Sequence, residues 1–475
     1  MADRGTAMPP GSVAPQPASP RSEDQANSPP RKRPRTQAPT QTAAPSTDVV
    51  DFAPQPTTEP PPPTVSQPAQ ARPSEIHRFL VQPLHRFQGA SASIKRPREV
   101  AHFSYDDNHE YRDDESSINY YIPPPLGADL KEGFDTFKHY EDKEDPHLDS
   151  LLRALMHKEK ESKDAGRAKI RADFVTWRGM MTKIMTAPYD NFAEFSMFAT
   201  LHDGTIYVEE DFPSRAASRA AETSRPPPRS HHPDQQSQAM MAYWGYKFET
   251  LSLIPSLPAT TAPAQIRAHQ QSITSNHAQH CSIVHTSFGP HTLLLGGEVD
   301  GLLAAKPQNP DEPVPWVELK TAEELPPRER QQHRDVLRFE RKLLKFWAQS
   351  FLLGVPQIVV GFRSKAGVLR GLQTFKTHEL PGMVRRGTAC WDGNVCINFA
   401  AEFLGWLKET VKGEGVYSVV LRKKSGVVEV TKVREGTGGI VSEDFLAWRK
   451  DRHGAGEEAS TQEDVDDKSK VESTV

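Results

Sequence analysis

The sequence has few cysteines and no long apolar run. Its 475 residues include only three cysteines, Cys281, Cys390 and Cys396, which are too few and too scattered for a disulfide framework and show no CxxC spacing. No apolar stretch reaches the roughly 18 residues that a transmembrane helix needs, and the N-terminus lacks the apolar core of a signal peptide. These absences argue against a disulfide-rich scaffold and predict a soluble intracellular protein with no membrane partner.

A strong charge of either sign is also missing. The chain has 58 Lys and Arg against 62 Asp and Glu, a net charge of −4, and residues 75–450 carry 48 of each sign. A protein that coats nucleic acid without selectivity is basic overall. Any contact with nucleic acid is therefore expected at a local site.

Large apolar residues are scarce in residues 1–74, which hold 18 of the 42 prolines. Such a segment cannot bury enough surface to offset its ordering entropy, so it is predicted to be a disordered arm. Its basic cluster, Arg31-Lys32-Arg33-Pro34-Arg35, is of the kind that nuclear import receptors bind and predicts a nuclear protein, with a random charge run as the alternative. Residues 451–475 are predicted to be a disordered acidic tail.

Residues 75–450 are predicted to form a single folded domain, with low-complexity surface insertions near 213–238 and 256–280. Apolar periodicity predicts helices near residues 146–155, 168–185, 329–353 and 398–411. Strands are expected in a hairpin about Asp203-Gly204, over 291–303, 314–320, 357–363 and 368–375, and in a last hairpin over 417–433. Helices mixed with hairpin-linked strands predict an α+β fold with a mixed β-sheet core flanked by helices.

Two carboxylates interrupt the apolar segment that begins at Leu293. Glu298 and Asp300 are two residues apart, so in a strand they share a face, and Glu318 and Lys320 repeat this arrangement on the next strand. Carboxylates that are buried together repel unless a proton or a cation lies between them. Oxygen ligands suit Mg²⁺ or Mn²⁺, so the pattern predicts a divalent-metal site, with an exposed salt-bridged strand pair as the alternative. The spacing resembles the Asp…Glu-x-Lys core of restriction-endonuclease-like nucleases.

Three more polar residues stand beside apolar stretches, namely Arg178, Glu249 and Gln349. Each alone is unremarkable, because an Arg after a Trp is usually at the surface and a Gln in a buried helix usually bonds a backbone carbonyl. Five motifs in order nevertheless resemble the Rai/DXO family of RNA 5′-end decapping nucleases, in particular its fungal nuclear branch: Trp177-Arg178-Gly179, Gly245-Tyr-Lys-Phe-Glu249, Glu298-Val-Asp300, Glu318-Leu-Lys320 and the helix that carries Gln349. The resemblance spans about residues 76–433.

This resemblance implies a metal-dependent hydrolase that removes 5′-triphosphates and incomplete or non-canonical caps, including NAD, from RNA. It also implies the residues of the site. One or two Mg²⁺ or Mn²⁺ ions would be held by Glu249, Glu298, Asp300, Glu318 and the main-chain carbonyl of Leu319. Lys320 and Gln349 would position the attacking water and the scissile phosphate, and Arg178, next to Glu249, would bind the RNA 5′ end.

Members of the fungal nuclear branch also bind and stimulate a nuclear 5′→3′ exoribonuclease, so the resemblance implies that partner. A mainly non-catalytic stabilising subunit of the exoribonuclease and a DNA-directed nuclease with the same core are the alternatives. The complete set of carboxylates argues against the first, because an unused acidic cluster costs stability. The oligomeric state stays open.

Overall fold

The computed structural model describes residues 75–450 except 162–168, 191, 224–235 and 310, and all of them lie in one compact unit of the chain, Ala71–Val475. The predicted arm with its Arg31–Arg35 cluster and the predicted acidic tail lie outside the described residues. No helix among those described is both long and apolar enough to cross a bilayer. All three cysteines are free thiols.

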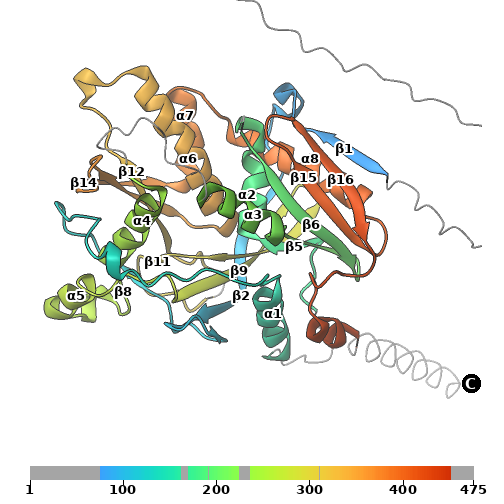
Figure 1. Cartoon of the computed structure of the whole chain (residues 1–475), viewed down its shortest axis with the longest axis horizontal. Helices are drawn as coiled ribbons and strands as arrows, with labels where there is room; N and C mark the ends of the chain where they lie inside the picture. Colours follow the sequence, from blue (N-terminus) through green and yellow to red (C-terminus); the bar gives the residue numbers. More distant parts are fainter. Residues whose placement is uncertain (1–74, 162–168, 191, 224–235, 310, 451–475) are drawn as a thin grey trace, which may run out of the picture. The chain divides into compact units, whose positions relative to one another are not determined.

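Ten strands form the larger of two sheets (Figure 1). Their spatial order is β1 (Ile76–Leu80), β16 (Val427–Arg434), β15 (Val416–Leu421), β6 (Phe195–His202), β7 (Thr205–Glu210), β5 (Phe174–Trp177), β10 (His291–Glu298), β9 (Gln279–Phe288), β2 (Ile94–Tyr105) and β3 (Tyr111–Arg112). Strand β5 runs parallel to both of its neighbours, and every other pair in this sheet is antiparallel. The sheet is therefore mixed.

Six strands form the smaller sheet. Their order is β14 (Leu369–Lys376), β13 (Gln357–Arg363), β12 (Trp316–Glu323), β11 (Gly301–Leu302), β4 (Tyr120–Tyr121) and β8 (Leu253–Ile254). Strand β10 of the larger sheet and β11 of the smaller one are separated only by Val299 and Asp300. The chain thus passes directly from one sheet to the other at this point.

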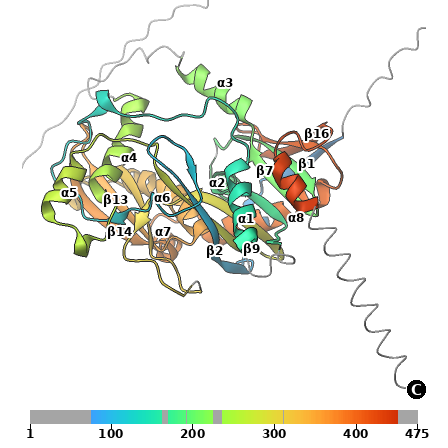
Figure 2. The ribbon, with the colours of Figure 1, turned by 90° about the horizontal axis from the view of Figure 1, so that it is seen from below.

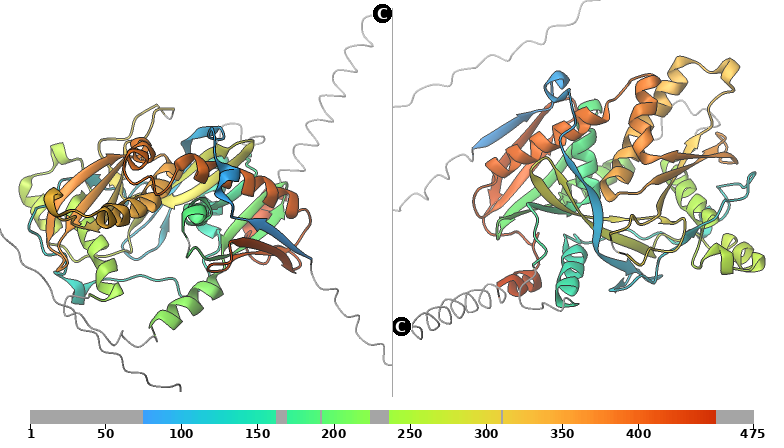
Figure 3. Two further views of the ribbon diagram at one scale, coloured as in Figure 1. Left: turned by 90° about the horizontal axis from the view of Figure 1, so that it is seen from above. Right: turned by 180° about the vertical axis from the view of Figure 1, so that it is seen from behind.

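Three helices cover one face of both sheets: α2 (Arg178–Thr186), α6 (His333–Leu353) and α8 (Gly393–Thr410). Figure 3 shows α6 and α8 lying over the strands. On the opposite face, α1 (Asp149–Glu161) packs on the larger sheet and α4 (Gln238–Ser252) on the smaller one. One hydrophobic core under α2, α6 and α8 therefore joins the two sheets, and each sheet has a second core of its own.

The remaining helices lie outside these layers. They are α3 (Phe212–Thr223), α5 (Pro263–Gln270), α7 (Leu380–Arg386), the helical residues 443–450 and the 3₁₀ segments Leu84–Phe87, Phe134–Thr136, Ala187–Tyr189, Pro258–Thr260, Arg328–Arg330 and Thr377–Glu379. Helices α3 and α5 fall within the two predicted insertions, and most of their residues are exposed (Figure 2).

The predicted α+β class is confirmed, and several elements lie where the sequence places them. The leucine stripe of the first predicted helix is wholly buried in α1 and the residue before it, at Leu148, Leu151, Leu152 and Leu155. The Asp203-Gly204 turn joins β6 to β7 with φ of 48° and 75°, a conformation that favours Asp and Gly.

Two predicted elements are wrong. Residues 174–177 form strand β5 before α2 begins, because β5 is buried on both faces between β7 and β10 and therefore lacks the alternation of a half-exposed strand. The single strand predicted over 291–303 is broken after Glu298, where the chain changes sheets.

Candidate active site

The acidic cluster lies where the two sheets meet. Glu298 is the last residue of β10, Val299 is buried, and Asp300 stands between the sheets. Glu298 and Asp300 therefore do not share a face of one strand, as the sequence predicted, and β10 and β12 are not neighbours. Strand β11 pairs with β12 and brings Glu318 next to Asp300, whose Oδ2 accepts a 2.6 Å hydrogen bond from the Leu319 N–H.

Strand β12 alternates as predicted. Val317 and Leu319 are buried in the core against α4, whereas Glu318 and Lys320 point to the other side. There Lys320 Nζ lies 2.6 Å from Glu318 Oε1, and Arg178 Nη1 donates a hydrogen bond of 3.2 Å to Glu318 Oε2. One buried carboxylate is thus held between two cations.

Two glycines before Glu298 allow Arg178 to come this close. A Cβ atom on Gly297 would lie 2.9 Å from Arg178 Cβ and from Leu353 Cδ1, and one on Gly296 would lie 2.7 Å from Leu151 Cδ1 and 2.9 Å from the Trp177 ring. Any larger residue at these positions would push α2 away from β10. The Leu-Gly-Gly-Glu sequence is therefore part of the site.

Burial and mutual repulsion raise the pKa of three carboxyls of the cluster. The pKa of Glu298 rises to about 7 through burial and the neighbouring Asp300, and that of Asp300 to about 6 through burial and Glu318. Burial, Asp300 and Glu298 raise the pKa of Glu249, at the C-terminal part of α4. Glu318 differs: burial opposes its charge, but Lys320 and Arg178 outweigh burial and hold its pKa below the usual value.

The residues fit a divalent cation. Four carboxylates, Glu249, Glu298, Asp300 and Glu318, surround two permanent cations, Arg178 and Lys320, which leaves an excess of two negative charges when all are ionised. Glu318 Oε1 is buried and pairs with Lys320 without hydrogen-bond geometry, so this oxygen keeps a lone pair for a ligand. Carboxylate oxygens are the ligands that Mg²⁺ and Mn²⁺ prefer.

The structure brings six of the predicted site residues together, and the other two are less closely tied to the cluster. Leu319 contributes its N–H to Asp300, whereas the prediction assigned its carbonyl to the metal. Gln349 is half-buried on α6, which packs against α2, β10 and β12. The metal-ligand role of the Leu319 carbonyl and the positioning role of Gln349 stay predictions.

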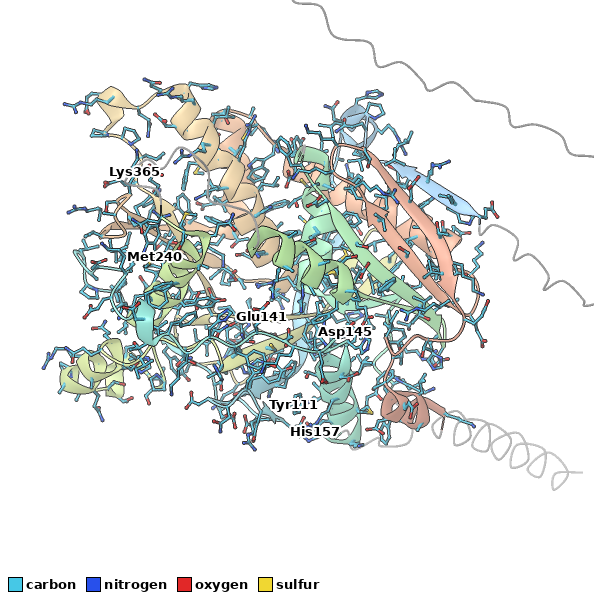
Figure 4. All side chains as sticks on the ribbon, in the orientation of Figure 1. Tyr111, Glu141, Asp145, His157, Met240 and Lys365 are labelled. Carbon is cyan, nitrogen blue, oxygen red and sulfur yellow. The ribbon has the colours of Figure 1, made fainter. Side chains whose placement is uncertain are left out.

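A pocket of about 1050 Å³ opens onto the cluster through Glu298. Protein atoms surround Glu298 on most sides, yet its side chain reaches the solvent of this pocket. The walls come from the segment 139–147 before α1, from α3, and from the start of α4. Glu141 and Asp145 of that segment lie between α3 and α1 (Figure 4).

Ion pairs join α3 to the opposite wall of the pocket. Arg219 pairs with Glu141, and Arg215 lies 3.4 Å from Asp142 and 3.2 Å from Glu210. All of these side chains are partly exposed, so each pair contributes little to stability. They nevertheless fix the side of the pocket on which α3 lies.

Two other groups in the described part of the chain have metal-ligand geometry, namely Glu99, His102 and Glu115, and Asp145, His147 and Glu209. In the first group Lys306 Nζ already lies 2.6 Å from Glu99 and 2.5 Å from Glu115 and supplies the positive charge. In the second, which lines the pocket, the His147 Nδ1 lies 3.0 Å from Glu209. Neither group includes a predicted ligand.

Sequence reasoning missed the pocket walls. The run His139-Tyr-Glu-Asp-Lys-Glu-Asp145-Pro-His147 is dense in rings and carboxylates, and this density was the available signal. The part played by α3 had no such signal, because its arginines lie in a stretch of low complexity.

Comparison with known proteins follows this geometry closely. Residues 95–446 match the family model described as RAI1 like PD-(D/E)XK nuclease. The chain is 46% identical over 373 residues to the decapping nuclease RAI1 of Emericella nidulans, covering 78% of this chain and 98% of that one. It is 34% identical over 340 residues to the decapping and exoribonuclease protein of Xenopus laevis, covering 68% and 78% of the two chains.

Solved structures agree in fold. The crystal structure of Scheffersomyces stipitis Rai1 in complex with (3′-NADP)⁺ and calcium ion is similar with a TM-score of 0.68 at 26% identity, covering 76% of this chain and 97% of that one. Candida albicans Rai1 in complex with pU5-Mn²⁺ has a TM-score of 0.72 at 24% identity, covering 80% and 100%.

Proposed function

The chain belongs to the RAI1-like PD-(D/E)XK nucleases and is a hydrolase of the decapping-nuclease class, and from this premise we propose which RNA ends it acts on and how its residues divide the work. Its substrates are RNAs whose 5′ end is a triphosphate, an incomplete cap or a non-canonical cap such as NAD. The convergence of four carboxylates with Arg178 and Lys320 at the floor of a solvent-filled pocket is the observation that supports this proposal most strongly.

A divalent ion, Mg²⁺ or Mn²⁺, is held by Glu249, Glu298, Asp300 and Glu318, and a second ion shares these ligands. When bound, such ions stabilise the charge that develops on the scissile phosphate and make water more acidic. The calcium ion in the Scheffersomyces stipitis relative supports the divalent charge of the ligand, not the choice of metal.

Lys320 and Arg178 act as fixed positive charges and not as bases. Burial opposes both charges, but Glu318 and Asp300 outweigh it and raise the pKa of both side chains above their usual values. Neither can therefore accept a proton from water at neutral pH. Lys320, paired with Glu318, positions water beside the scissile phosphate together with Gln349, and Arg178 binds a phosphate oxygen of the RNA 5′ end.

The volume of the pocket supports removal of a whole cap unit. A cavity of about 1050 Å³ is at the upper end of the range for ligand sites, and it accepts a dinucleotide such as NAD ahead of the scissile bond. The Scheffersomyces stipitis relative carries (3′-NADP)⁺, a NAD with one more phosphate, which supports NAD as one of the caps.

Nuclear residence and binding to a nuclear 5′→3′ exoribonuclease complete the proposal. The first rests on the Arg31–Arg35 cluster, and the second on the similarity to fungal RAI1 proteins. The monophosphorylated product of end removal is the substrate that such an exoribonuclease degrades.

A product analysis tests the proposal. The full chain with Mn²⁺ is incubated with RNAs of one sequence that carry triphosphate, unmethylated-cap, methylated-cap, NAD or monophosphate ends, and with a DNA of the same sequence. We expect release of the end group from triphosphate, unmethylated-cap and NAD RNA, and loss of turnover by about 10³-fold or more in Glu298→Gln, Asp300→Asn protein. Preference for DNA, or stimulation of an exoribonuclease without hydrolysis of any RNA end, would overturn it.

A further inference from the structure

One wall of the pocket combines stacked rings with carboxylates. His109 is sandwiched between Tyr105, at a centroid distance of 4.0 Å and 13°, and Tyr140, at 3.6 Å and 22°. Burial lowers the pKa of His109, so the sandwiched ring is neutral at physiological pH. The three rings thus form one uncharged column along the pocket, and Tyr140, which is half-buried, stands at one end of it.

A carboxylate stands beside this column. Asp142 acts electrostatically on all three rings, and together with burial it raises the pKa of Tyr140. The Asp142 side chain is 31% exposed, and its ion pair with Arg215 is long, at 3.4 Å. Asp142 is therefore available to a ligand that stacks on Tyr140.

The charge of the whole pocket favours a cation as well. Six carboxylates and two guanidinium groups line it, namely Glu141, Asp142, Asp145, Glu209, Glu210 and Glu298 against Arg215 and Arg219. Phosphate groups are repelled by such a wall, and a neutral base would stack on Tyr140 but gain nothing from the carboxylates. A planar cation gains from both, because the face of an aromatic ring attracts positive charge.

We infer that the Tyr105–His109–Tyr140 column and Asp142 form a binding site for the cationic, oxidised nicotinamide ring of an NAD cap. The inference rests on the proposed function and adds to it that the protein selects NAD ends by the charge of the ring. Reduction of that ring removes its positive charge and its aromaticity while the rest of the dinucleotide is unchanged. NADH is therefore the matched ligand that the site discriminates against.

Equilibrium binding tests this assignment without turnover. Isothermal titration calorimetry of the full chain in Ca²⁺ measures the Kd of free NAD⁺ and of free NADH. A planar cation on one ring with one adjacent carboxylate predicts binding of NAD⁺ that is about three- to tenfold tighter. Asp142→Asn and Tyr140→Leu should each bring the ratio of the two Kd values close to one. The control Glu144→Gln, an exposed acid of the same segment that does not line the pocket, should leave the ratio unchanged.

Several results would overturn the inference: equal affinities in the unmutated chain, no measurable binding of either dinucleotide, or a ratio that both variants leave unchanged. Hydrolysis of NAD-capped RNA is measured in parallel. Selective binding of NAD⁺ without hydrolysis of NAD-capped RNA would contradict the proposed function and leave the binding site standing. Hydrolysis with equal affinities would do the opposite.

Discussion

At the scale of single residues, Lys320 separates a role in chemistry from a role in binding. Because it pairs with Glu318 inside the cluster, Lys320→Gln should lower kcat by about 10²-fold or more while KM for triphosphorylated RNA changes less than about threefold. Lys306→Gln is the matched control, because Lys306 is also a partly buried lysine between carboxylates but lies outside the pocket lining. A rise in KM alone would make Lys320 a phosphate clamp.

Glu209 predicts a pH dependence of stability. Burial raises its pKa to about 7, although the adjacent His147 opposes the shift. The folded protein therefore holds a proton that the unfolded chain releases above about pH 4.5, so the stability tied to this proton is present at low pH and is lost as pH rises through 7.

Urea unfolding at pH 5 and pH 8 checks this shift. Relative to Glu209→Gln, the unmutated protein should lose on the order of 2 kcal/mol of unfolding free energy between these two pH values. A difference between the two proteins that stays constant with pH would show that Glu209 titrates normally.

Which site residues the sequence could predict depended on their local setting. Glu318 and Lys320 were predictable, because Val317 and Leu319 alternate with them on a regular strand. Glu298 was predictable as a residue, but its relation to Asp300 was not. The break in the strand arises from pairing of Gly301 with Val317, a contact between segments far apart in the sequence.

At the scale of elements, the helical residues 443–450 are tied to α1 by a buried ion pair. Arg449 Nη2 lies 2.7 Å from Glu159 Oε1, and Glu159, which is fully buried, also accepts bonds of 2.8 Å from the Ile170 N–H and the Trp448 indole. Removing the arginine would leave a buried carboxylate without its cation.

Arg449→Ala should therefore lower the free energy of unfolding by about 3–5 kcal/mol in urea. Lys432→Ala, which breaks an exposed pair with Glu435, should cost less than about 1 kcal/mol. A small effect of Arg449→Ala would mean that the last helical turn contributes little to the domain.

Elements with one dominant period were predictable, and those buried on two sides were not. The α1 stripe and the β6–β7 hairpin follow from local pattern alone. Strand β5 does not, because a short apolar run buried on both faces has the same composition as a buried helical turn. The pocket wall was equally hidden, since α3 meets the segment 139–147 only through ion pairs across the pocket.

At the scale of the whole molecule, the division into arm and domain predicts separable functions. Deleting residues 1–74 should leave the hydrolysis of triphosphorylated RNA in vitro unchanged and move the protein from the nucleus to the cytoplasm. Fluorescence microscopy of tagged chains measures the second effect. Replacing only Arg31, Lys32, Arg33 and Arg35 by Gln is the matched control and should have the same result. Nuclear accumulation of the truncated chain would contradict the import assignment.

The passage of the chain from one sheet to the other at Val299 and Asp300 has a consequence for how activity arises during folding. Glu298 belongs to the larger sheet and Glu318 to the smaller, and the helical layer that holds the sheets together is completed by residues as late as 410. A nascent chain that has just produced all four carboxylates therefore has no means of holding them at one point. Hydrolysis begins only after the C-terminal helices have docked, so a partly synthesised copy on the ribosome does not attack the 5′ end of a nearby RNA.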